Sequence, residues 1–293
     1  MSGVDRPGMS STIDSDAVAR PAAAGVRARK TLLFANDKSS GKTTTANAVL
    51  VTLLQRYPIL MRTVEVREYE RAPRLSAIFR KEDGFGNVVH RDARNAAAFE
   101  VARELAYDPN ATPWDDLLYD IGIGNLIVDL GSNMFTEICR ILDDEPRPIF
   151  PDDCSRVGVV VPVTTASDSI ESGIAAIEHV AGWGARAQVF IIEQEYLGRF
   201  SDEMNDWTAF RARVAAQSDR VRVIRLEKLA VADIGGVVFQ RIDRIVADAQ
   251  ATLRSEKLQG AALLRALRKA RAEIAWGTRT LDSMRPVADW FAT

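Results

Sequence analysis

The sequence predicts an α/β fold in which a doubly wound, mostly parallel sheet is flanked by helices, with a helical extension at the C-terminus. Short apolar runs alternate along the chain with longer segments of helical spacing. Several of the runs are continuous in Val, Ile and Leu, as expected of strands that are buried on both faces. Regular alternation of strands and helices is typical of a doubly wound sheet.

Six apolar runs are predicted to be strands, and they occupy residues 31–35, 60–66, 125–130, 157–163, 188–194 and 221–227. Segments of helical spacing lie between and after them, at 43–57, 70–81, 91–106, 133–144, 167–183 and 236–256. The stretch KEDGFGNVVH at 81–90 contains two glycines and is predicted to be a loop or a hairpin.

The chain is expected to have three parts. Residues 1–29 are rich in Ser, Ala, Gly and Pro, lack the apolar core of a secretory signal, and are predicted to be a flexible arm. Residues 30–253 form the α/β domain. Residues 254–293 form the C-terminal helical extension, in which apolar residues recur at helical spacing.

Composition excludes several classes of protein. Lys and Arg total 38 against 40 for Asp and Glu, so net charge gives no sign of nucleic-acid binding, which would need a local basic patch. The two cysteines and two histidines form no metal-binding or disulfide pattern, which suits a reducing cytoplasm. No run approaches the ~20 apolar residues of a membrane span.

The first predicted strand leads into a candidate phosphate-binding loop, TLLFANDKSSGKTTT. The pattern GxxxxGK[ST] between a strand and a helix wraps backbone N–H groups around a phosphate, while its lysine reaches the outer phosphates and its hydroxyl holds Mg²⁺. The loop residues expected to bind nucleotide are Asn36, Asp37, Lys38, Ser39, Ser40, Gly41, Lys42, Thr43 and Thr44. The alternative is a polar turn in which Ser or Thr caps the helix.

Asn36 stands where the motif has its first glycine, and asparagine tolerates positive φ better than other non-glycine residues. A second feature supports the site. The strand NLIVDL carries Asp129 near its end, where a Walker B carboxylate would orient Mg²⁺. Capping of the following helix is the alternative role for Asp129.

On these residues the chain resembles the ParA/MinD-like P-loop ATPases, and in particular their divergent plasmid-stability and conjugation-associated (StbB-like) members. The resemblance covers residues from about 30 to 250 and includes the order of the loop, the acidic second strand VEVREYE, and IVDLGSN. It implies binding and slow hydrolysis of ATP with Mg²⁺. Lys42 would neutralise the transferred phosphoryl group, Thr43 would bind Mg²⁺ directly, and Asp129 would hold the ion through water.

The chain departs from the family at several positions. Asp37 replaces the family's signature lysine, which crosses to the partner subunit's phosphates, and Lys38 follows one place later. The catalytic aspartate of the family's second strand aligns best with Glu65, with Glu68 and Glu70 nearby. The asparagine that contacts the adenine edge corresponds to Glu193 or Gln194, so the base preference stays open.

The basic segment 254–271 is either the solvated face of a helix that packs on the core or a surface for DNA, RNA or an acidic partner. The resemblance implies a nucleotide-dependent homodimer, a DNA-binding partner protein, and non-specific DNA bound through this segment. Trp276 and Trp290 are expected to pack in the interior. Two other functions are considered. A P-loop kinase of a small molecule would use arginines of 71–81 as a lid over the phosphates, and a degenerate scaffold would keep the fold without catalysis.

Overall fold

The computed structural model describes residues 29–36, 40–70, 74–79, 88–92, 117–118, 121, 124–144, 156–183, 187–201, 204–217, 219–229, 240–255 and 260–293. In this part of the chain no helix is long and apolar enough to cross a membrane.

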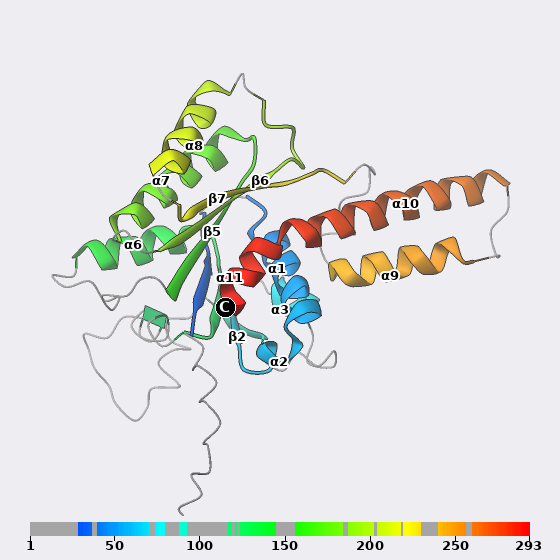
Figure 1. Cartoon of the computed structure of the whole chain (residues 1–293), viewed down its shortest axis with the longest axis horizontal. Helices are drawn as coiled ribbons and strands as arrows, with labels where there is room; N and C mark the ends of the chain where they lie inside the picture. Colours follow the sequence, from blue (N-terminus) through cyan, green and yellow to red (C-terminus); the bar gives the residue numbers. More distant parts are fainter. Residues whose placement is uncertain are drawn as a thin grey trace, which may run out of the picture.

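The described strands form one seven-stranded sheet in the order β3-β2-β4-β1-β5-β6-β7, with every pairing parallel (Figure 1). The strands are β1 (Thr31–Phe34), β2 (Glu65–Glu70), β3 (Val88–Asp92), β4 (Leu126–Leu130), β5 (Val157–Val163), β6 (Gln188–Gln194) and β7 (Val221–Leu226). The order changes direction about β1, which lies at the centre of the sheet. This confirms the predicted doubly wound α/β fold.

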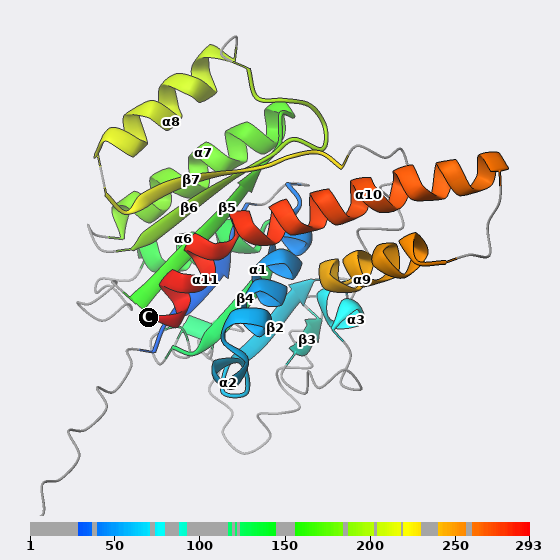
Figure 2. The same cartoon turned by 45° about the vertical axis from the view of Figure 1, so that its right-hand side comes forward.

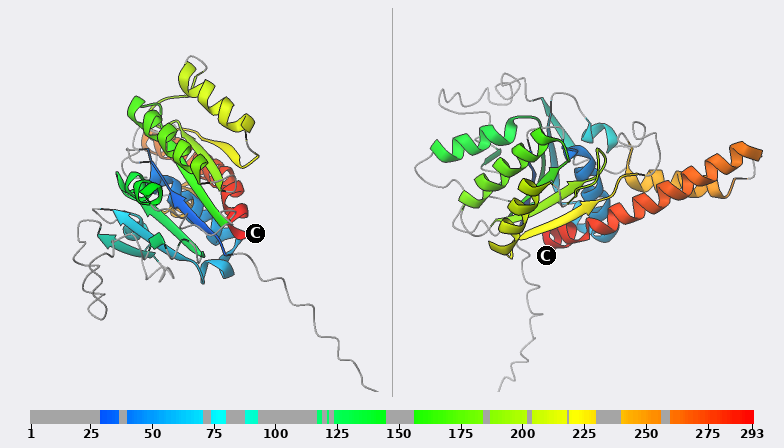
Figure 3. Two further views of the ribbon diagram at one scale, coloured as in Figure 1. Left: turned by 90° about the vertical axis from the view of Figure 1, so that its left-hand side faces the viewer. Right: turned by 90° about the horizontal axis from the view of Figure 1, so that it is seen from above.

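Helices cover both faces of the sheet, as Figures 2 and 3 show. One face is covered by α6 (Met134–Asp144), α7 (Ser167–Gly182) and α8 (Asn205–Gln217). The other is covered by α1 (Lys42–Arg56), α2 (Pro58–Met61), α3 (Leu75–Ile78), α9 (Ile242–Leu253), α10 (Gly260–Ser283) and α11 (Arg285–Ala292).

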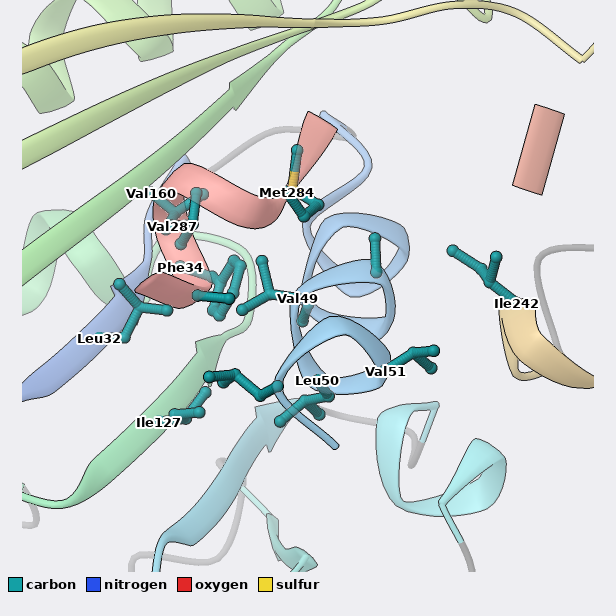
Figure 4. Packing of buried hydrophobic residues seen from close by; sticks show 14 of the residues in the cluster. Leu32, Phe34, Val49, Leu50, Val51, Ile127, Val160, Ile242, Met284 and Val287 are labelled. Atoms are coloured by element: carbon teal, nitrogen blue, oxygen red, sulfur yellow. The ribbon is translucent and has the colours of Figure 1, made fainter. Parts of the chain in front are cut away.

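Two apolar cores result, because successive side chains of a strand point to opposite faces. In β1, Leu32 and Phe34 join the core beneath α1, while Leu33 joins the core beneath α6 and α7. Figure 4 shows the first of these cores, in which Val49 and Leu50 of α1 lie against the sheet. Burial on both faces explains why β1 reads as an uninterrupted apolar run.

The C-terminal extension is helical, as predicted, and its last helix belongs to the main core. Met284, Val287 and Phe291 are fully buried in the cluster that contains α1 and β1. Figure 4 shows Met284 and Val287 in this cluster. Lys30, just before β1, donates from Nζ to the Trp290 carbonyl at 2.6 Å. The helices α9 and α10 pack against each other, and their far ends project from the sheet (Figure 2).

Several predicted boundaries are wrong. The strand predicted at 60–66 lies at Glu65–Glu70, because Pro58 starts the short helix α2 over the residues before it. Within the predicted helix 70–81, Leu75–Ile78 are helical, and 71–73 and 80–81 lie outside the described residues. Strand β3 takes up residues 88–90, which were predicted to belong to a loop or hairpin, and residues 91–92, which were predicted to start a helix. The rest of 81–106 lies outside the described residues. The helix predicted at 236–256 runs over Ile242–Leu253.

Candidate functional site

The candidate site lies at the carboxyl ends of the central strands, where β1 turns into α1. The backbone takes positive φ at Asn36 (129°) and at Gly41 (82°), so the two ends of the loop both adopt conformations that usually require glycine. Gly41 is the N-cap residue of α1, and Lys42 begins the helix. Asp37, Lys38 and Ser39, all predicted to bind nucleotide, lie outside the described residues.

The amide of Asn36 fastens the start of the loop to its surroundings. Its Nδ2 donates to the Pro162 carbonyl at 2.8 Å and to the Ser169 carbonyl at 3.1 Å, and the side chain is buried. The Lys42 ammonium in turn donates to the carbonyl of Asn36. The residue that replaces the motif's glycine thus adds two hydrogen bonds that glycine could not make.

Thr43 and Asp129 meet at the start of α1. The Thr43 hydroxyl donates to Asp129 Oδ2 at 3.1 Å. Thr43 belongs to α1, which follows β1, and Asp129 lies near the end of the adjacent strand β4. Asp129 is only 3% exposed. A hydroxyl beside a carboxylate offers the hard oxygen ligands that Mg²⁺ prefers. Protein sites for Mg²⁺ often supply one carboxylate, and phosphate oxygens of the ligand complete the coordination of the ion.

Ser40 and Thr44 lie on either side of Thr43 in the sequence. Ser40 is fully buried, and its Oγ has no hydrogen-bond partner among the described residues. Thr44 is half-buried in the first turn of α1. An orphaned buried hydroxyl beside a helix N-terminus fits a loop that hydrogen-bonds to phosphate oxygens.

The structure does not bring Glu65 to this site. Glu65 starts β2, in register with Leu126 of β4, and pairs with Arg67 at 2.6 Å. Asp129 lies three positions further along β4, about 10 Å at 3.3 Å per residue. The acidic residue in register with Asp129 is Glu68.

Glu68 is fully buried and already has four donors. Its carboxylate accepts the N–H groups of Arg74, Leu75 and Ser76 and the Ser76 hydroxyl, at 2.6–3.0 Å. It therefore caps α3 and holds that helix next to the candidate site. With the second strand at its observed bounds, Glu65–Glu70, the register with β4 brings Glu68 rather than Glu65 level with Asp129.

The residues at the end of β6 also have defined partners. Glu193 is 1% exposed and accepts from Trp207, Arg211 and Arg225. The Gln194 amide lies against Gly41 of the loop.

Tyr196 lies in the turn after β6, close to the start of α7. Burial, and then the negative charge of Asp168, raise the pKa of Tyr196 above its ordinary value of 10.0.

A glycine-lysine-threonine turn thus joins the central strand to the first helix, with an aspartate at the end of the adjacent strand, as the phosphate-binding pattern predicts. No family model and no curated protein matches the chain. Among solved structures, the chain is similar to a putative plasmid partition protein from Borrelia burgdorferi B31 bound to AMPPNP, with 14% identity and a TM-score of 0.36. The match covers 86% of this chain and 99% of that one. The residues of the site, rather than this likeness, carry the proposal that follows.

Proposed function

We propose that this chain is a ParA-like switch that binds ATP with Mg²⁺, hydrolyses it slowly, and acts in plasmid partition or conjugative DNA transfer. The observation that carries the proposal is the contact between Thr43 and Asp129 beside the Gly41 turn. A carboxylate and a hydroxyl from adjacent strand ends, next to a lysine and a helix N-terminus, suit the phosphates and metal of a nucleoside triphosphate.

Each residue has a defined role in this proposal. The amides from Ser40 to Thr43 bind the phosphates, and Lys42 moves its ammonium from the Asn36 carbonyl to the outer phosphates. Thr43 and Asp129 hold Mg²⁺, which supplies charge neutralisation. The described residues contain no cluster of three or more His, Cys, Asp or Glu that could hold a metal by themselves.

Titration calorimetry with ATP and Mg²⁺ tests the site directly. The wild-type chain should bind, and Lys42→Ala should abolish binding at millimolar nucleotide because the ammonium that neutralises the phosphates is lost. Lys228→Ala, an exposed lysine beyond β7, is the matched control and should bind as the wild type does. Absence of binding by the wild type would refute the proposal and favour a degenerate scaffold.

A switch of this kind requires that the bound nucleotide changes the oligomeric state of the protein. We expect a monomer with ADP and a dimer with a non-hydrolysable ATP analogue, measured by size-exclusion chromatography with light scattering. Slow release of phosphate, accelerated by a DNA-binding partner, would fit a switch whose rate of hydrolysis sets the lifetime of the ATP-bound state. Transfer of the phosphoryl group to a small acceptor instead would identify a kinase.

The outer part of the α9–α10 hairpin is proposed to contact DNA non-specifically. Among the described residues, five exposed basic side chains lie there, namely Arg254, Arg265, Arg268, Lys269 and Arg271. Arg265, Arg268 and Arg271 follow each other at intervals of three, which places them along one face of α10. A row of guanidinium groups on a projecting helix suits the phosphates of a duplex.

Fluorescence anisotropy with a short DNA duplex tests this contact. Replacing Arg265, Arg268 and Arg271 by Ala should weaken binding and reduce the salt slope by about 3, or about one for each lost phosphate contact. Arg279→Ala is the control, since Arg279 lies on the same helix but pairs with Glu227 at 2.9 Å. Equal salt slopes for the wild type and the triple variant would contradict the contact.

A further inference from the structure

Gln194 is the last residue of β6 and reaches the phosphate-binding loop from two strands away. Its Nε2 donates to the Gly41 carbonyl at 2.8 Å and to Thr45 Oγ1 at 2.6 Å, and the side chain is 5% exposed. A Cβ on Gly41 would lie 2.5 Å from both Nε2 and Oε1 of this amide. This close approach, together with the positive φ of 82° at Gly41, favours glycine at position 41.

The three residues form a closed hydrogen-bonded ring. The Thr45 hydroxyl donates to the Gly41 carbonyl at 3.1 Å while it accepts from Gln194, and the Thr45 N–H donates to the same carbonyl at 2.9 Å. Both protons of the Gln194 NH₂ group are used in this way. The ring fixes the peptide of Gly41, and with it the direction of the N–H groups that follow in the first turn of α1.

Glu193, the neighbour of Gln194, is committed elsewhere. Its carboxylate accepts from Trp207 Nε1 at 2.9 Å, from Arg211 at 2.6 Å and from Arg225 at 3.1 and 3.2 Å. These partners hold it on the opposite face of the sheet from Gln194, because adjacent strand residues alternate. The two side chains that the sequence suggested for reading a nucleobase thus both form internal hydrogen bonds.

We propose that Gln194 is a positioning residue of the phosphate-binding loop and plays no part in recognising the base. Its amide sets the Gly41–Thr45 turn so that the amides at the start of α1 are arranged for a polyphosphate. The ligand group that depends on Gln194 is then the triphosphate alone, whichever base is attached. This inference rests on the proposed nucleotide site.

The test compares ligands that share the triphosphate and differ in the rest. Dissociation constants for ATP, GTP and inorganic tripolyphosphate, each with Mg²⁺, are measured by calorimetry for the wild type and Gln194→Leu. Leucine occupies a similar volume and cannot donate. We expect all three ligands to weaken by the same factor, about tenfold, because one network of hydrogen bonds is lost. The ratio of the ATP and GTP constants should stay within about twofold of the wild-type ratio.

A second pair of variants guards against misfolding of Gln194→Leu. Thr45→Val removes the hydroxyl from the ring and should weaken the three ligands equally, while Thr45→Ser keeps the hydroxyl and should bind as the wild type does. A general loss of packing would not distinguish these two substitutions in this way.

Two results would overturn the inference. A change in the ATP to GTP ratio of more than about fivefold in Gln194→Leu would make Gln194 a base-reading residue. Unchanged binding of all three ligands in both Gln194→Leu and Thr45→Val would show that the ring has no effect on the loop. If the wild type binds none of the three, the proposed function itself fails, and the inference fails with it.

Discussion

Asn36 allows a quantitative test of how the loop is held. It occupies a backbone conformation of φ 129°, which carries a strain of about 1–3 kcal/mol for a residue with a Cβ. Its two amide hydrogen bonds to buried carbonyls offset this strain, since each contributes about 0.5–1.5 kcal/mol. The measured quantity is the free energy of unfolding in urea, followed by tryptophan fluorescence.

Asn36→Gly relieves the strain but loses both hydrogen bonds. It also destabilises the fold by about 0.5–1 kcal/mol, because glycine gives the unfolded chain more conformational entropy to lose on folding. The three contributions leave this variant about 1 kcal/mol less stable than the wild type. Asn36→Ala loses the same bonds and keeps the strain, so we expect it to be less stable than the glycine variant by about 1–2 kcal/mol.

Asn133 provides the control, because it also has positive φ (66°) but its side chain is exposed. Asn133→Gly should change stability by less than about 0.5 kcal/mol. If Asn36→Gly is more stable than the wild type, the amide bonds do not offset the strain and asparagine is merely tolerated there. If the alanine variant is more stable than the glycine variant by about 0.5–1 kcal/mol, which is the entropy cost of glycine alone, the loop carries no strain at this residue.

Three further predictions concern the surroundings of the site. Gly158→Ala should lower the free energy of unfolding in urea by about 1–3 kcal/mol, because its methyl would lie 2.5 Å from the Trp290 ring. Adding Trp290→Phe should recover part of this loss, and wild-type stability of Gly158→Ala would contradict the packing. Glu193→Gln should cost about 1–3 kcal/mol, since a charge-assisted network is weakened, and an unchanged unfolding midpoint would argue against it. The raised pKa of Tyr196 stabilises the fold fully below the unfolded pKa of 10.0, and this stability is lost as pH rises through the folded value. Tyr196→Phe should therefore reduce the loss of stability above pH 10.0, and Asp168→Asn should lower the pKa of Tyr196 in a spectrophotometric titration.

Strands buried on both faces could be predicted well, and half-exposed elements could not. β1, β4, β5 and β6 are buried at every position and read as continuous apolar runs. β2 mixes buried and charged residues, so its start was placed too early, and Glu65 was aligned where Glu68 stands. α8 was missed because its sequence is polar, with Trp207 as its fully buried anchor.

Contacts between distant segments were beyond prediction from one sequence. The pattern GKT indicated the position of the loop, but nothing in it shows that the Asn36 amide bonds to Pro162 and Ser169, or that Gln194 reaches Gly41. These bonds depend on the strand order, which brings β5 and β6 beside β1. The choice of partner is therefore decided by tertiary structure rather than by local propensity.

The burial of α11 has a consequence for how the chain reaches its native state. Lys30 and Trp290 are separated by 260 positions, yet they are in contact beside the central strand. On a ribosome the core beneath α1 would stay incomplete until the last helix had emerged, leaving Leu32 and Phe34 without part of their cover. Contacts of such long sequence separation slow folding, so this half of the molecule should acquire its protection from hydrogen exchange last and depend most on chaperones during synthesis.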